Sequence, residues 1–208
     1  LNLTAQGLVL SACFLQIPAG SLPAPAGSLL RSCSLGRDGI ARRLQLGDSD
    51  GSIRRALAQF PQPDMAQRVL DSYFIPEGKA KQTPFKLSSM PALHMKRPLI
   101  ELMVIANFVE IFLAKEGYHN PVGINYLEKI QLPTLPSLFG AMLAGVDFIL
   151  MGAGLPLSIP GILDRLSCWE TVELELHVED NPQRSIFTHR FDPKEFFSEE
   201  LPPLSRPK

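Results

Sequence analysis

Apolar residues recur with helical spacing in the first half of the chain. Between 53 and 60 they fall at positions i, i+3, i+4 and i+7, and Pro61 follows. This spacing predicts a helix with one buried face, which the proline ends. A second helix is expected just downstream, because Asp64 and Gln67 resemble a capping box and apolar residues then line one face. We therefore expect packing helices within residues 50–74.

The segment 99–166 has a different pattern, in which short apolar runs alternate with helical stretches. The run 102–106 (LMVIA) is continuously apolar, which is typical of a strand covered on both faces. Similar runs occur at 122–126 and 147–151, so three strands are expected. Each strand is followed by a predicted helix: at 108–115, between Thr134 and Gly145, and after Ser158.

Strands that alternate with helices at this spacing predict parallel pairing through right-handed crossovers. The fold class is therefore α/β. Both a (β/α) barrel and an open, doubly wound sheet fit the pattern. The glycine signature of a dinucleotide-binding fold follows none of the strands, and the nearest approach, Gly152-Ala153-Gly154, lacks the third glycine.

The segments on either side of the βα units have patterns of their own. In 171–192 apolar and polar residues alternate with a period of two around a turn at 180–182, which predicts an inserted β-hairpin. Residues 76–98 are expected to form a surface loop. We expect 1–38 to be irregular, because PAGSL occurs twice within 18–29 and offers little apolar surface.

Composition excludes several classes of function. A net charge of −1 over 208 residues argues against a nucleic-acid partner. Three cysteines without a C-x-x-C pair, and four histidines without ligand spacing, argue against a metal site, and the cysteine usage favours the reducing cytoplasm. No apolar run is long enough to predict a membrane span. Neither a G-x-S-x-G elbow nor a Walker A sequence is present.

In parallel α/β folds, ligands bind beyond the carboxyl ends of the strands. That rule selects Asn107, residues 125–131 and residues 151–154. Amide side chains there could bond the edge of a flat heterocycle, Lys129 could stabilise negative charge, and small residues would let backbone N–H groups approach a ligand. Asn107 could equally cap a helix, Lys129 could be a solvated surface residue, and 152–154 could be a simple βα turn.

The sequence also resembles a known family. The runs LIELMVIANFVEIFLAKEG (99–117) and NPVGINYLEKIQLPTLPSLFGAMLAGVDFILMGAG (120–154), followed by PGILDRL, are similar to the nitronate monooxygenases, formerly called 2-nitropropane dioxygenases. The likeness is to the longer bacterial members, which are related to the trans-acting enoyl reductases of polyunsaturated fatty acid synthases. It extends over about 41–208, whereas 1–36 do not resemble the start of the family.

The resemblance implies that 39–208 form part of an FMN-binding TIM barrel. Such enzymes oxidise alkyl nitronates with O₂ to carbonyl compounds and nitrite. By position, the residues expected to line the flavin ring are Asn107, Asn125, Lys129, Gln131, Met151, Gly152, Ala153 and Gly154.

The family's Gly-Gly-His catalytic motif and its Gly-rich phosphate loops are not found up to Lys208, so we expect a fragment with no identified catalytic residue. Two alternatives stay open. One is a flavin-dependent enoyl-thioester reductase of the same superfamily. The other is a non-catalytic half barrel that self-associates through its open edges.

Overall fold

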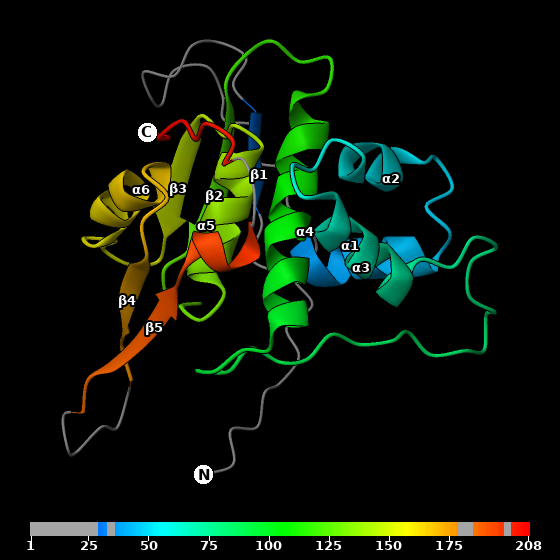
Figure 1. Cartoon of the computed structure of the whole chain (residues 1–208), viewed down its shortest axis with the longest axis horizontal. Helices are drawn as coiled ribbons and strands as arrows, with labels where there is room; N and C mark the ends of the chain where they lie inside the picture. Colours follow the sequence, from blue (N-terminus) through cyan, green and yellow to red (C-terminus); the bar gives the residue numbers. More distant parts are fainter. Residues whose placement is uncertain (1–28, 33–35, 179–184, 198–200) are drawn as a thin grey trace.

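The protein is a mixed α/β structure with a small parallel sheet, as the sequence predicts. The computed structural model describes residues 29–32, 36–178, 185–197 and 201–208 (Figure 1). The strands are β1 (Leu29–Ser32), β2 (Val122–Leu127), β3 (Phe148–Gly152), β4 (Val172–Leu176) and β5 (Phe187–Phe191). The helices are α1 (Gly36–Gln45), α2 (Ser52–Leu57), α3 (Pro63–Tyr73), α4 (Arg97–Lys115), α5 (Thr134–Leu143) and α6 (Ile159–Ser167), with a short 3₁₀ helix, η1 (Pro193–Phe196).

The parallel sheet has the order β1-β2-β3. Ser32 lies opposite Asn125 in one pair of strands, and Asn125 lies opposite Leu150 in the other. Lys208 extends this sheet: its N–H donates to Asp147 O at 2.9 Å, and Ile149 N–H donates to its carbonyl at 2.8 Å. Two bonds of this kind on either side of Phe148 are the parallel-strand pattern, so Lys208 pairs with the edge of β3 that faces away from β2.

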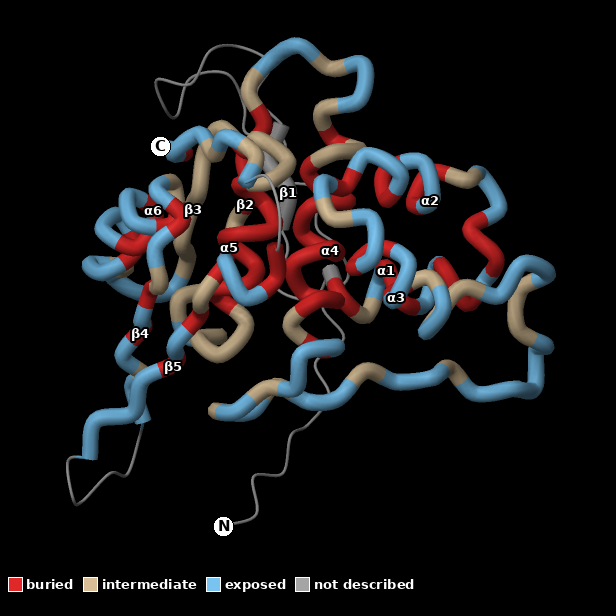
Figure 2. Tube along the Cα trace, viewed as in Figure 1, coloured by how far each residue is buried: buried red, intermediate tan, exposed pale blue. Residues whose placement is uncertain are grey.

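Helix α4 is the centre of the fold (Figure 1). It packs against α1, α2 and α3 on one side and against α5, β1 and β2 on the other. Buried residues run along most of α4 and α5 in Figure 2. The core therefore lies between the helices and one face of the sheet, where Ile124 and Tyr126 of β2 stand beside Ile149 and Met151 of β3.

The predicted strand at 102–106 is wrong, because this segment is the middle of α4. All five of its residues are buried, so its apolar run reflects a helix covered on every side rather than a strand covered on two. The predicted helix at 108–115 is the second half of the same helix. The first parallel strand is instead β1, which lies within the segment 1–38 that was expected to be irregular. The rest of the PAGSL repeat lies outside the described residues.

Other local predictions are confirmed or adjusted by a few residues. Helix α2 buries the first three residues of the predicted stripe but ends at Leu57, and Phe60 is buried in the turn that follows. The capping box is wrong: α3 begins at Pro63 after Gln62, and Gln67 donates to Asp71 instead. Thr134 is the first residue of α5 rather than its cap, and its hydroxyl donates to Ile130 O.

The β-hairpin is confirmed as an antiparallel pair of strands, β4 and β5, while its predicted turn at 180–182 lies outside the described residues. Aromatic rings join it to the rest of the core. Phe139 of α5 contacts Trp169, Phe191 and Phe197, with ring centroids 5.3, 5.4 and 5.8 Å away. The tilted contact between Phe139 and Phe191 packs the hairpin against α5.

In the segments that the structure describes, no helix combines the length and the apolar character that crossing a membrane requires.

Candidate functional site

The carboxyl ends of β2 and β3 bring one predicted polar residue and one predicted glycine together. A Cβ atom built on Gly152 would lie 3.8 Å from Asn125 Oδ1 and 3.5 Å from Leu127 Cδ2, so the Asn125 amide stands beside the Gly152 backbone. Asn125 is partly exposed, and its side chain makes no hydrogen bond to another described residue. Its donor and acceptor are therefore not committed to other described parts of the fold.

The loop after β3 has an unusual backbone. Ala153 adopts φ 62°, a left-handed conformation that costs an L-residue roughly 1–2 kcal/mol. The loop is tied to the loop after β2, because Glu128 N–H donates to Gly152 O at 2.9 Å. A Cβ on Gly154 would lie 2.7 Å from Glu128 Cδ, so a larger residue there would require Glu128 to move. Strain held in place by such contacts at a strand end is common at ligand sites.

Two predicted residues after β2 have different surroundings. Gln131 is engaged on both sides of its amide: Nε2 donates to His177 O at 3.0 Å, and Oε1 accepts from His177 N–H at 2.6 Å. It therefore fastens the β2–α5 loop to the hairpin and is not free to bond a ligand. Lys129 is exposed in a turn, and its ammonium pairs with no described carboxylate.

Asn107 does not lie at a strand end, which corrects its predicted position. It is buried in the middle of α4, where its Nδ2 donates to Met103 O at 2.8 Å. The Tyr126 hydroxyl lies 3.0 Å from Asn107 Oδ1 and 3.0 Å from Ser137 O. Asn107 thus satisfies polar groups between α4, α5 and β2, and we assign it to the core rather than to a ligand site.

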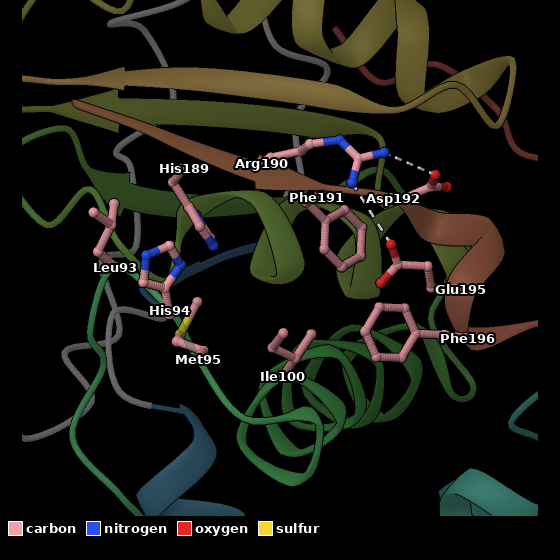
Figure 3. Close-up of a pocket in the computed structure, with 10 residues that line it drawn as sticks. All are labelled: Leu93, His94, Met95, Ile100, His189, Arg190, Phe191, Asp192, Glu195 and Phe196. Carbon is pink, nitrogen blue, oxygen red and sulfur yellow. Dashed lines mark hydrogen bonds and ion pairs between the residues drawn. The ribbon is translucent and has the colours of Figure 1, made fainter. Parts of the chain in front are cut away.

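A second candidate is a cavity of about 210 Å³, which none of the eight predicted residues lines (Figure 3). Its walls come from the segment before α4, from α4 itself, and from β5 and η1. They are formed by Leu93, His94, Met95, Ile100, His189, Arg190, Phe191, Asp192, Glu195 and Phe196.

His189 is the unusual residue of this cavity. It is only 4% exposed, and burial lowers its pKa below the usual 6.5. Its Nδ1 atom is buried without a hydrogen-bond partner in the described structure. A buried polar atom left unpaired costs about 1–3 kcal/mol, so a ligand or water that meets it would relieve that cost.

Sequence reasoning missed this cavity because His94 precedes the βα units in the sequence and His189 follows them, and their separation matches no ligand-binding motif. The only sequence signal was that His189 occupies an inward position of the alternating hairpin, opposite Leu174. An imidazole in that row must be buried.

No protein-family model, curated protein or solved structure matches the chain.

Proposed function

We propose that this chain is the flavin-binding part of an FMN-dependent oxidoreductase of the nitronate monooxygenase type, acting on alkyl nitronates with O₂. Its sheet would then be one part of a (β/α) barrel.

The observation that carries the proposal is the order of the parallel strands. Each strand lies beside its predecessor, from β1 to β2 to β3, and Lys208 pairs with the next edge in the same direction. Barrels are wound in this sequential order, whereas doubly wound sheets reverse direction at a switch point. The order, together with the resemblance of 99–154, supports a barrel whose ligand would lie at the carboxyl edge.

Fewer residues at that edge than the sequence predicts are available to contact a flat heterocycle. Asn125 has an uncommitted amide, Ala153 and Gly154 are exposed, and Lys129 is exposed and could turn toward negative charge. These residues would hold the ring, whereas Asn107 and Gln131 are occupied elsewhere and the Met151 side chain packs against the core on the other face of the sheet. FMN would supply the electron acceptor for nitronate oxidation, and the chain's residues would bind and orient its ring.

The test is FMN binding by the purified chain, followed as a change in flavin fluorescence. Asn125→Ala should weaken binding about 5- to 10-fold, the value of one hydrogen bond of roughly 1–1.5 kcal/mol. Asn120→Ala is the matched control, because Asn120 is an exposed asparagine just before the opposite end of the same strand. No flavin binding by the wild-type chain, or equal loss in both variants, would refute the proposed site.

A second measurement separates the reactions. Nitrite release from propionate-3-nitronate supports a nitronate monooxygenase, while NAD(P)H oxidation that depends on an enoyl thioester supports the reductase. A flavin-free chain that self-associates in gel filtration supports the half barrel. A cytoplasmic location stays a prediction from the cysteine usage.

A further inference from the structure

Two imidazoles and a thioether meet at one end of the cavity between α4 and the hairpin. His94 and Met95 come from the segment that leads into α4, and His189 comes from β5. Figure 3 shows the rings of His94 and His189 turned toward each other, with the sulfur of Met95 beside His94. Three donor side chains from two distant parts of the sequence therefore line one wall.

His189 has a ring nitrogen that no neighbouring group occupies in the described structure. It is almost fully buried, and Nδ1 has no partner in the described structure. Burial also lowers the pKa of His189 below its ordinary value. The side chains of Phe191 and Phe196 line the same cavity.

The carboxylates of the cavity are paired with Arg190, which lines the same cavity. Arg190 lies 3.4 Å from Asp192 Oδ2 and 3.7 Å from Glu195 Oε1. Asp192 also accepts from the Thr171 hydroxyl at 2.8 Å. Over the described ranges, no three His, Cys, Asp or Glu side chains are grouped closely enough to hold a metal ion. A zinc or calcium site completed by carboxylates is thus not supported, and the available donors are two nitrogens and one sulfur.

We propose that His94, Met95 and His189 bind one Cu(I) ion at the end of this cavity. Cu(I) is a soft ion that is stable with two or three nitrogen and thioether donors, whereas zinc sites use four ligands and favour thiolate, imidazole or carboxylate. The ion would occupy the unpaired position at His189 Nδ1. Since His94 is exposed and Met95 partly exposed, the ion can enter from the solvent side. This site is independent of the proposed flavin chemistry.

The test is anaerobic competition for Cu(I) between the full chain and bicinchoninate, with ascorbate present. We expect one ion per chain. His94→Gln and Met95→Leu should each weaken binding at least tenfold, and neither change touches the buried core. The controls are His119→Gln and Met90→Leu, which alter exposed residues of the same types outside the cavity and should change affinity less than twofold.

A second readout identifies the buried ligand. In long-range proton–nitrogen spectra of the imidazoles, Cu(I) should shift the ¹⁵N resonances of two rings, and one of these should disappear from the spectrum of His189→Gln. If His189→Gln does not fold, the His94 and Met95 variants still decide. Absence of stoichiometric binding, equal loss in the control variants, or tighter binding of Zn(II) than of Cu(I) would overturn the proposal.

Discussion

A close approach of two helix backbones in the core predicts a strong effect of a one-carbon substitution. Gly140 of α5 lies directly against α4, where a Cβ atom at this position would stand 2.9 Å from Val104 Cα and 2.8 Å from Val104 C. Cβ atoms do not approach other carbons this closely. Because the obstructing atoms are backbone atoms inside a buried helix, no side-chain rotation can relieve the clash. Gly140→Ala must therefore push α5 away from α4.

Two opposing effects set the size of the loss. Replacing glycine by alanine inside a helix stabilises it by about 0.5–1 kcal/mol. Overpacking a core costs typically about 1–3 kcal/mol, and a clash with backbone belongs at the upper end. We therefore expect the free energy of unfolding to fall by about 2 kcal/mol. In a domain of this size that corresponds to a Tm lower by roughly 4–8 °C.

Urea unfolding, followed by far-UV circular dichroism and Trp169 fluorescence, measures this change. Gly161→Ala in α6 is the matched control, because nothing lies within 4 Å of its Cβ position. That variant should be as stable as the parent or more stable by about 0.5 kcal/mol. If Gly140→Ala were as stable as Gly161→Ala, the close packing of α4 on α5 would be wrong, and with it the central helix of the fold.

Three further changes test other contacts by urea unfolding or hydrogen exchange. Arg68→Met removes a two-bond partner from Glu101, a carboxylate only 2% exposed, and should cost about 1–2 kcal/mol; an unchanged midpoint would contradict this. Asp48→Ala removes the carboxylate that accepts two backbone N–H groups in the first turn of α2, at 3.1 and 3.0 Å, and should lower the free energy of unfolding by about 2 kcal/mol. Unchanged stability would show that water replaces the carboxylate. Gln131→Ala should speed exchange of the His177 amide about tenfold while changing global stability by less than about 1 kcal/mol; a protected amide would show that the hairpin is held otherwise.

The sequence predicted the elements whose hydrophobic period is distinctive. Strands β2 and β3 are short apolar runs between turn residues, and α5 is placed by Thr134 and Gly145 near its ends although nearly all of its residues are buried. Helix α6 has one buried face, and strand β4 alternates buried and exposed residues. Local spacing then carries enough information to place the element.

Helix α4 could not be recognised in the same way. Its burial is nearly complete around residues 102–109, so the helical period disappears and the segment looks like a covered strand. Length was the remaining signal, since no glycine or proline interrupts 99–115. Strand β1 was missed for the opposite reason: four residues next to a Pro/Gly-rich repeat have little intrinsic preference, and their strand conformation comes from pairing with β2.

The structure leaves fewer residues for the candidate flavin site than the sequence predicts. Three asparagine or glutamine side chains were expected at the ring, but Asn107 bonds Met103 O inside α4 and Gln131 bonds the His177 backbone. Both amides stabilise the fold by bonding its backbone, so the position of an amide residue in the sequence does not by itself predict a ligand contact. Asn125 is the predicted amide that makes no bond to a described residue, and it stands beside Gly152. The proposed contact with flavin therefore depends on one side chain and on the backbone of the loop after β3, which is why the comparison of Asn125 with Asn120 decides it.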